Sequence, residues 1–506
     1  INMPQLKLPM TLKDKCLQEC VNLYCGVLTR WISKLRQAEA SNRAAYGIAK
    51  DIILAECRQI ERSLSEFPYF VIEMMSPQLT RKFADMIINY KLKPTAFWEK
   101  ESRRILCSAM FRSVLTPHVY EYNHEIMSCF YIQDLLVETL DSVPGLRTLH
   151  LRFRALKYCY PSALERMICQ LKHLQVFICK LLCTDEVIEQ LGLHCTHLKK
   201  ASLCCSDVTN ASVKHLLRLR KLEFLNLSET RIDKENYAFL LSELPQIKEI
   251  VFRGNEDDIL DHVAEKNLHK ISHVSGKVED ISKLAQRCRN ITNLDICLFT
   301  LIEAPSGLAA LTTLHTLRLA RGDYATCNLK AVLTDIGHRL TDLFLEGIEH
   351  VNIRDIVTLC PSLSSLTLLS CTLSPLDLHT QLDPQLPHFR KLTSLHISGG
   401  RDDARIRDYI RHYVSLKTIR LKWNNIFTAR FMLEVVRSGT LADLEDIEVH
   451  EDGPHAMTAE ALELLIKHCS HLKSIKGSKT CYRIPRRFIE ELKRRLLVQN
   501  FDLEIN

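Results

Sequence analysis

Glycine is scarce in this sequence, with 15 residues among 506, and none forms a glycine-rich loop ahead of a Lys-Ser or Lys-Thr pair. Loops that hold phosphate groups need such glycines, so a nucleotide-dependent enzyme is not expected. The Gly-x-Ser-x-Gly segment of α/β-hydrolases is missing too. Because no other nucleophile and base stand at a recognisable spacing, we predict a protein that is not an enzyme and needs no cofactor.

Long apolar runs are missing as well. No stretch of about eighteen apolar residues occurs, so we expect no membrane span. The first residues carry charged side chains such as Lys13 and Asp14 instead of the apolar core of a signal peptide. Residues 1–10 are expected to be a loose leader that begins with a tag remnant. With 20 cysteines and no secretion signal, the chain should keep its thiols reduced in the cytoplasm or the nucleus.

A strong charge of one sign is also absent. The net charge is only +7, and basic residues are mixed with acidic ones, so neither nucleic acid nor a membrane surface is expected as a partner. Two His-Cys-x-His segments, at 194–197 and 468–471, contain residue types that bind zinc. They fall at equivalent points of two distant repeats and their spacing does not suit a shared ion. We therefore predict no metal site.

What the sequence does contain is a repeated apolar pattern. Beyond Pro144, the pattern Leu-x-x-Leu-x-Leu returns roughly every 21 to 29 residues, which is the period of leucine-rich repeats. The clearest copies begin at Leu146, Leu222, Leu314, Leu340, Leu363, Leu392 and Leu416. Weaker copies begin at Leu174, Leu198, Ile247, Ile291, Leu444 and Leu472, and the poorest is Leu268-Ile271-His273.

A single repeat of this kind cannot bury its apolar residues alone, so neighbouring repeats must stack into one parallel sheet. We predict an α/β leucine-rich-repeat horseshoe over residues 118–476, with parallel strands inside and helices outside. An all-helical docking module is predicted for residues 11–117. A cap is predicted for residues 477–506, where a helix should follow Pro485 and a last strand should lie near Ile505.

Cysteine stands three residues before the first apolar residue in four of the repeats. The four are Cys195, Cys288, Cys360 and Cys469. At this position a cysteine should close the outer helix of the preceding repeat. The pattern resembles the cysteine-containing repeat subtype of F-box receptors and related intracellular proteins.

The helical module should begin with an amphipathic helix from Thr11 to about Ala38. Thr11 can cap it by accepting a hydrogen bond from the backbone of Asp14. Helical spacing places one set of apolar residues on a common face: Leu12, Cys16, Cys20, Val21, Leu23, Leu28 and Trp31. A second helix is predicted for 43–67, with its inward face made by Ile48, Ile52, Ile53, Cys57, Ile60 and Leu64.

Residues 11–21 resemble the BC box, by which substrate receptors of cullin-2 and cullin-5 ubiquitin ligases hold elongin C. The segment is similar to the box of the von Hippel–Lindau tumour suppressor, except that Cys20 stands where Ala, Ile, Leu or Val is usual. A buried thiol behaves as a small apolar group, so the exchange is compatible with docking. The resemblance implies that elongin C is contacted by Leu12, Cys16, Leu17, Cys20 and Val21.

Residues 76–87 resemble more loosely the cullin box that follows the BC box in cullin-2 receptors. In that box a proline opens a helix whose apolar face meets the cullin. Here the helix would start at Pro77, and the resemblance implies that the cullin is contacted by Pro77, Leu79, Phe83 and Ile87. Plain packing inside the helical module is the alternative for these residues.

The strand residues between the leucines of each repeat should line the concave face of the array, which is the default binding surface. Candidate contacts for a protein substrate are Phe224, Asn226, Arg318, Phe344, His396 and Arg420. Farther along the chain, the same face should carry Lys417, Glu445, Asp446, Glu448, Lys473 and Lys476. The mixed signs favour a protein partner with its own charge pattern.

Three functions fit these features. The favoured hypothesis is a non-catalytic substrate receptor of a cullin-2 ubiquitin ligase, which binds elongin C with elongin B, cullin-2 with its RING protein, and a protein substrate. The second is an F-box type receptor that binds Skp1, although no good F-box is present. The third is an interaction scaffold with no link to a ligase.

Overall fold

The computed structural model describes residues 12–89, 97–113, 115, 120–122, 135, 137–152, 161–252, 259–276, 278, 280–298, 306–374, 389–399, 410, 415–422, 428–450, 457–477, 484–498 and 503–505. The chain forms two compact units. The N-terminal unit consists of Met10–Gly254 and Asp261–Asn267, and the C-terminal unit of Ile1–Pro9, Asn255–Leu260 and Leu268–Asn506. None of the described helices is long and apolar enough to cross a membrane.

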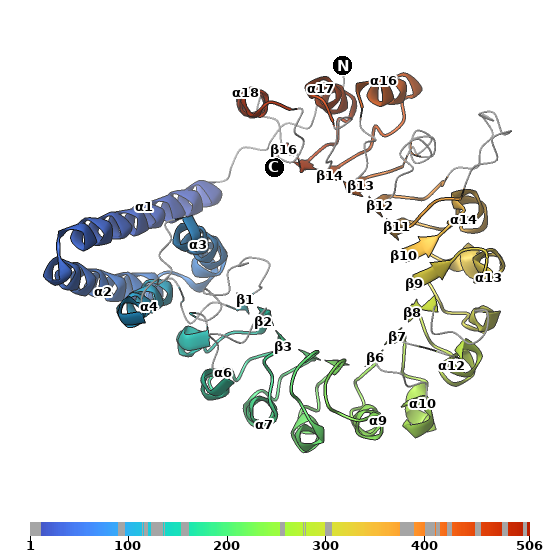
Figure 1. Cartoon of the computed structure of the whole chain (residues 1–506), viewed down its shortest axis with the longest axis horizontal. Helices are drawn as coiled ribbons and strands as arrows, with labels where there is room; N and C mark the ends of the chain where they lie inside the picture. Colours follow the sequence, from blue (N-terminus) through green and yellow to red (C-terminus); the bar gives the residue numbers. More distant parts are fainter. Residues whose placement is uncertain are drawn as a thin grey trace. The chain divides into compact units, whose positions relative to one another are not determined.

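Four helices open the N-terminal unit: α1 (Leu12–Ser41), α2 (Arg43–Ser65), α3 (Tyr69–Asn89) and α4 (Phe97–Arg112). Helix α1 packs on α2 and α3, and α2 packs on α4. Figure 1 shows α1 and α2 as an antiparallel pair in blue. Asn42 lies between them with an extended backbone, and its side chain accepts a hydrogen bond from the Ala45 N–H at 2.8 Å. Because Asn42 caps α2 in this way, the chain turns back after a single residue.

The second helix confirms part of the predicted inward face and corrects the rest. Ile53, Cys57 and Leu64 are buried, but Ile48 is 65% exposed and Ile52 46% exposed. Around a helix axis, Ile48 and Ile52 lie roughly 140° and 100° away from Ile53, so they point away from the neighbours that cover Ile53. The prediction that both pack inside is wrong.

The third helix begins earlier than predicted. Helix α3 runs without interruption from Tyr69 to Asn89, so Pro77 lies in its ninth position and does not open it. A proline inside a helix removes one backbone hydrogen bond and crowds the preceding turn. The helix continues across it because its inward residues Ile72, Met75, Leu79 and Phe83 are all buried.

Among the described residues of the N-terminal unit, six short parallel strands follow: β1 (Glu121–Tyr122), β2 (Thr148–Arg152), β3 (Val176–Lys180), β4 (Lys200–Ser202), β5 (Phe224–Asn226) and β6 (Glu249–Phe252). Each is hydrogen-bonded to the next along the chain. The connecting segments contain η2 (Leu140–Ser142), α6 (Pro161–Ile168), α7 (Asp185–His194), η3 (Asn210–Ser212), α8 (Val213–Leu216) and α9 (Lys234–Glu243). These strands and the four helices therefore belong to one compact unit, and residues 117 and 118, the predicted module boundary, lie outside the described residues.

The C-terminal unit continues the same scheme after α10 (Ile259–His262) and α11 (Glu265–Leu268). Its strands are β7 (His273–Gly276), β8 (Asn293–Cys297), β9 (Thr316–Asp323), β10 (Asp342–Glu349), β11 (Ser365–Leu369), β12 (Ser394–Ser398), β13 (Thr418–Lys422), β14 (Asp446–His450), β15 (Ser474–Lys476) and β16 (Glu504–Ile505). Its helices are α12 (Ile281–Arg287), η5 (Ser306–Ala310), α13 (Leu329–Ile336), η6 (Gly337–Arg339), α14 (Ile353–Leu359), α16 (Ala429–Ser438), α17 (Ala459–His468) and α18 (Arg486–Val498).

The apolar triads of the repeats form the core of both units. In β11, for example, Leu366 and Leu368 are buried while Ser365 and Thr367 are partly exposed, and Leu366 lies opposite Leu343 and Leu395 of the adjacent strands. Within the C-terminal unit, Figure 1 shows the strands on the inner side and the helices on the outer side. The predicted fold class, α/β leucine-rich repeats with parallel strands inside and helices outside, is confirmed.

The poorest copy of the pattern has a different register from the predicted one. Val274 of β7 pairs with Leu294 of β8, and Gly276 pairs with Ile296. The triad of this repeat is therefore Ile271, Val274 and Gly276, three residues later than predicted. Glycine at the third position contributes no side chain to the core, which hides this repeat from a search for leucines.

The repeat cysteines close the outer helices, as predicted. Cys195, Cys288, Cys360 and Cys469 are the C-cap residues of α7, α12, α14 and α17 and are fully buried. The Cys469 thiol donates to the Leu441 carbonyl of the preceding repeat at 3.2 Å. Burial raises the pKa of Cys195, Cys360 and Cys469 to about 12 and that of Cys288 to about 11. No disulfide joins any cysteines in the part of the chain that the structure describes.

The predicted terminal elements are present. Helix α18 starts directly after Pro485, and β16 adds to β15 through the pairs Ser474–Glu504 and Ile475–Ile505. Ile489, Leu492 and Leu496 of α18 are buried and Lys493 and Arg494 are exposed. Strand β15 thus has a neighbour, and α18 is linked to α17 by the Arg495–Glu463 ion pair, so both layers continue to the end of the array.

Candidate functional site

Helix α1 has two apolar faces with different surroundings. Val21, Tyr24, Leu28, Trp31 and Leu35 are buried against the other helices. On the next face around the helix, Leu23 is 71% exposed, and Cys20 and Val27 are half-buried. We call Cys20, Leu23 and Val27 the α1 stripe. Leu23 is therefore accessible on the surface of α1, as single apolar side chains often are.

The residues predicted to contact elongin C divide between these two faces. Val21 is 1% exposed and belongs to the interior, so its predicted contact with elongin C is corrected to a packing role. Leu17 is half-buried four residues before Val21, and Cys20 lies on the α1 stripe. Thr11 and the side chains of Leu12 and Cys16 lie outside the described part of the chain. Leu12 and Cys16 precede Cys20 by eight and four residues. That they share a helix face with Cys20 stays a prediction from the sequence.

The residues predicted to contact a cullin are placed inside the module where they are described. Leu79 and Phe83 are each 1% exposed. The ring centroids of Phe83 and of Phe111 in α4 are 5.3 Å apart. Both side chains hold α3 to its neighbours, so the predicted contact with a cullin is corrected to packing for these two residues. The side chains of Pro77 and Ile87 lie outside the described part.

Polar contacts fix α1 on its buried side. The carboxylate of Glu56 in α2 accepts hydrogen bonds from the Trp31 indole and from Lys34, and these bonds lower the pKa of Glu56. Tyr24 and Ser113 are joined through their hydroxyl oxygens at 3.1 Å. Burial raises the pKa of Cys57 to about 12. The α1 stripe is therefore presented by a helix whose rotation about its axis is set by specific contacts.

The inner face of the C-terminal unit is the second candidate surface. We use this name for the strand residues of β7–β16 that point away from the triads. One register line across β8–β14 consists of Asp295, Arg318, Phe344, Thr367, His396, Arg420 and Glu448. Four of the predicted substrate contacts, Arg318, Phe344, His396 and Arg420, therefore lie on a single line across adjacent strands.

Arg318 and Phe344 contact each other. The Arg318 guanidinium lies 3.8 Å from the centroid of the Phe344 ring, and one of its nitrogens lies 3.6 Å from the Asp295 carboxylate. Asp295 also accepts a hydrogen bond from Ser275 at 3.3 Å. A partner would therefore meet a preformed cation–π pair here, not two separate anchors.

His396 has a different environment on the same line. The ring is half-buried, and its Nε2 has no hydrogen-bond partner among the described residues. Burial lowers the pKa of His396, and the positive charges of Lys422 and Arg420 lower it further. The lowered pKa favours the neutral ring at pH 7, with an Nε2 atom that no group in the described ranges satisfies.

Phe224 and Asn226, the remaining predicted contacts, lie on β5 in the N-terminal unit and are half-buried. The Asn226 side chain accepts a hydrogen bond from the Ser228 N–H at 2.9 Å, which shapes the turn after the strand. Asn226 therefore has a structural role in its own repeat.

Charged side chains gather on strands β13–β15 of the inner face. The Glu445 carboxylate lies 3.0 Å from the Lys417 ammonium and also pairs with Lys473. The Glu448 carboxylate lies 3.6 Å from Arg420 and 3.3 Å from Lys422. Glu445 thus has a basic group on each side, whereas both basic groups that pair with Glu448 belong to β13.

Asp323, Glu349 and His350 bring potential metal ligands within 4.8 Å of one another. Asp323 already accepts hydrogen bonds from the Ala325 and Thr326 N–H groups, at 3.0 and 2.8 Å, and pairs with His350 Nδ1 at 2.7 Å. The bonds from Thr326 and His350 lower the pKa of Asp323 to about 2. The cluster is accounted for by the turn after β9, and we assign no metal to it.

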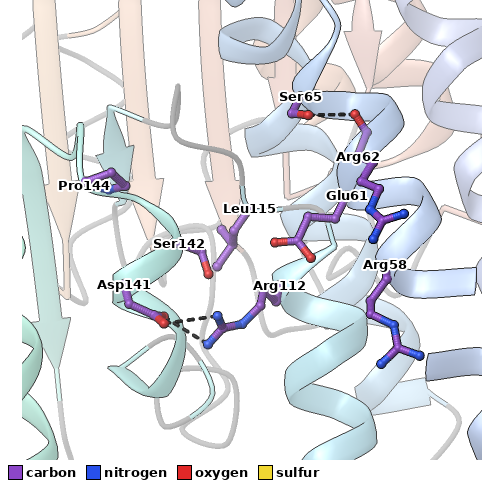
Figure 2. Close-up of a pocket in the computed structure, with 9 residues that line it drawn as sticks. All are labelled: Arg58, Glu61, Arg62, Ser65, Arg112, Leu115, Asp141, Ser142 and Pro144. Atoms are coloured by element: carbon purple, nitrogen blue, oxygen red, sulfur yellow. Dashed lines mark hydrogen bonds and ion pairs between the residues drawn. The ribbon is translucent and has the colours of Figure 1, made fainter. Parts of the chain in front are cut away.

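A cavity of about 520 Å³ lies in the N-terminal unit (Figure 2). Its lining residues come from α2, from α4 and Leu115 beyond it, and from η2 and Pro144: Arg58, Glu61, Arg62, Ser65, Arg112, Leu115, Asp141, Ser142 and Pro144. Arg112 holds Asp141 through two hydrogen bonds of 3.0 Å, and the Ser65 hydroxyl donates to the Arg62 carbonyl at 2.7 Å. The lining is mostly polar and charged, and we assign no function to it.

No family model and no curated protein matches the chain. Solved structures that match include an internalin, InlF, from Listeria monocytogenes, with 16% identity, a TM-score of 0.33, and coverage of 67% of this chain and 82% of the internalin. The leucine-rich-repeat protein LIC12759 of Leptospira interrogans has 16% identity, a TM-score of 0.33, and coverage of 78% and 91%. TLR13 in complex with ssRNA13 has 14% identity, a TM-score of 0.40, and coverage of 72% and 60%.

TM-scores this low support no conclusion about the shape or the function of this chain. The assignment of the chain therefore depends on its own repeats, namely the strands joined in chain order and the buried triads between them. By these features the chain is a leucine-rich-repeat protein.

Proposed function

We propose that this chain is a non-catalytic substrate-recognition subunit of a cullin-2 RING ubiquitin ligase. In this role α1 binds elongin C, which is accompanied by elongin B, and the repeats bind a protein substrate on their inner face. The chain would act in the cytoplasm or the nucleus and would position a substrate for ubiquitin transfer by other subunits.

The observation that carries the proposal is the exposure of Leu23. It lies two residues beyond the segment that resembles a BC box, on the same helix and next to Cys20 around the axis. Burying a leucine side chain against a partner contributes about 1.5–3 kcal/mol. An exposed stripe of this kind extends the surface that Leu12 and Cys16 are predicted to offer.

The contact with cullin-2 has weaker support. Leu79 and Phe83 are buried, and Pro77 does not start a helix. The cullin assignment therefore depends on the resemblance at Pro77 and Ile87. This observation favours, as a second candidate, a leucine-rich-repeat interaction scaffold without a ligase; the F-box type receptor that binds Skp1 is a further alternative, based on the repeat cysteines.

Capture from cells separates these functions. The tagged full chain and its variant Leu12→Ala plus Cys16→Ala are expressed, and bound elongin C, cullin-2 and Skp1 are measured by immunoblot. The ligase proposal requires elongin C with the wild type and its loss with the variant. The matched control is Ile48→Ala plus Ile52→Ala, which changes two exposed apolar residues on α2 and should keep elongin C. Skp1 in place of elongin C supports the F-box function, and the absence of both supports the scaffold.

A further inference from the structure

Two rows of charged residues, one directly before strands β13–β15 and one on them, run across these strands of the C-terminal unit. The first row is Lys417, Glu445 and Lys473, which directly precede the three strands. The second row is Arg420, Glu448 and Lys476, which are in register on the strands, with Lys422 beside Glu448. We call them the basic rows.

In both rows the carboxylates lie deeper than the basic groups. The side chain of Glu445 is 23% exposed, whereas those of Lys417 and Lys473 are 57% and 56% exposed. Glu448 is 21% exposed and Arg420 54%. Hydrogen bonds from Lys473 and Lys417 lower the pKa of Glu445, so it stays ionised at neutral pH. Within each row the outermost charges are therefore positive, and each row has more cations than carboxylates. The exposed carboxylate of Asp446 lies between the two rows on β14.

We propose that the basic rows bind an acidic, extended segment of the protein partner that the repeats recognise. The inference deepens the proposed function, because it names the chemistry of the substrate, but it does not depend on elongin C. Strands in a sheet are about 4.8 Å apart, so β13 and β15 are separated by about 10 Å, the length of roughly three residues of extended chain. Carboxylates three residues apart in the partner would reach the basic groups at both ends of a row.

A polypeptide fits this surface better than a nucleic acid. Glu445, Asp446 and Glu448 would repel a continuous phosphate backbone. Single-stranded nucleic acids also need aromatic side chains on which bases can stack. The described residues of β13–β15 include no Phe, Tyr or Trp. Separate carboxylates on a peptide can instead occupy the cationic positions and leave the acidic ones free.

The test measures binding of the full chain to a fluorescein-labelled peptide with glutamate at every third position, by fluorescence anisotropy at low ionic strength. The comparison probes are the same peptide with glutamine in place of glutamate and an oligouridylate of equal charge. Lys417→Ala plus Lys473→Ala should weaken binding of the acidic peptide by about tenfold or more. Glu445→Gln plus Glu448→Gln should strengthen it, since both changes remove negative charge without a large change in shape.

A matched control removes two positive charges from the outer helices of the same repeats. Arg430→Ala plus Lys467→Ala should leave peptide affinity unchanged, because both residues are exposed on α16 and α17. Should the lysine variant unfold, the glutamine variant still provides a test. Equal affinity for the glutamate and glutamine peptides, or tighter binding of the oligouridylate, would overturn the inference. Because elongin C is absent from this assay, its outcome is separate from that of the ligase proposal.

Discussion

Val21 and Leu23 are two residues apart on α1 and lie on different sides of the helix, one fully buried and the other largely exposed. The helical repeat of 3.6 residues puts them about 200° apart around the axis. The apolar residues of α1 therefore serve two surfaces. One holds the helical part of the N-terminal unit together, and the other is exposed and is the surface that we propose for docking.

The burial of Phe83 predicts a loss of stability when it is truncated. Phe83→Ala should destabilise the N-terminal unit by about 3–5 kcal/mol, because a cavity is left beside Phe111. Leu23→Ala should cost less than about 0.5 kcal/mol, since Leu23 makes few internal contacts. Urea unfolding, followed with hydrogen exchange of α3 and α4, measures both. Equal costs for the two variants would contradict the placement of these residues.

Asp185 predicts a pH-dependent link between adjacent repeats. Its carboxylate accepts hydrogen bonds from the Thr209 N–H at 2.9 Å, the Thr209 hydroxyl at 2.6 Å and the Ser212 hydroxyl. Burial raises the pKa of Asp185, but the bonds from Ser212 and Thr209 outweigh it and the net shift is downward. A lowered pKa means that the stabilisation is present at neutral pH and is lost as the pH falls below about 4.

Asp185→Asn should therefore lower the stability at pH 7 by about 1–3 kcal/mol, and the difference should shrink at pH 3. Thermal unfolding at the two pH values measures it. Glu186→Gln, on the exposed neighbour, is the control. A difference that is the same at both pH values would show that the charge of Asp185 is not involved.

We expect the repeat cysteines to be alkylated slowly, and we expect the folded chain to lose stability at alkaline pH. Since burial raises the pKa of Cys195, Cys360 and Cys469 to about 12, these thiols stay protonated and covered at pH 8. Iodoacetamide followed by peptide mass spectrometry should modify the exposed Cys205 first and these three only on unfolding. Rapid modification of Cys360 in the folded chain would contradict its position as a buried helix cap.

The same shifts set the direction of the alkaline effect. A thiol whose pKa is raised on folding keeps its proton better in the folded state, so its contribution is complete below the unfolded pKa of about 8.5. That contribution is lost as the pH rises toward 12. Thermal melts between pH 8 and 11 should show falling stability, and a Cys469→Ala variant should show less of the fall.

The periodic triads made the fold predictable, because every repeat must bury its own apolar residues against the next. The exception at β7 has a physical cause: Gly276 occupies the last triad position and gives no apolar signal. The four cysteine caps were predictable from their constant distance to the triads. The first basic row is also visible in the sequence. Lys417, Glu445 and Lys473 are spaced 28 residues apart, so they occupy the same position in successive repeats.

The candidate docking surface was only partly predictable. Periodicity shows that α1 has apolar residues on a broad arc, but it cannot tell which part of the arc other helices cover. Val21, Leu79 and Phe83 were assigned to partners for this reason, and the structure places them in the interior. The same limit applied to Ile48, whose exposure depends on the direction from which α1 and α4 pack on α2.

The most direct test of the account is titration calorimetry of the purified full chain with purified elongin B/C complex. The wild type should bind with one-to-one stoichiometry, and Leu23→Asp should weaken binding by about tenfold or more, because a carboxylate would have to be buried in an apolar contact. The melting temperature of Leu23→Asp should stay unchanged, since Leu23 is exposed. The absence of binding by the wild type, or equal affinity of the Leu23→Asp variant, would contradict the claim that the α1 stripe is the docking surface.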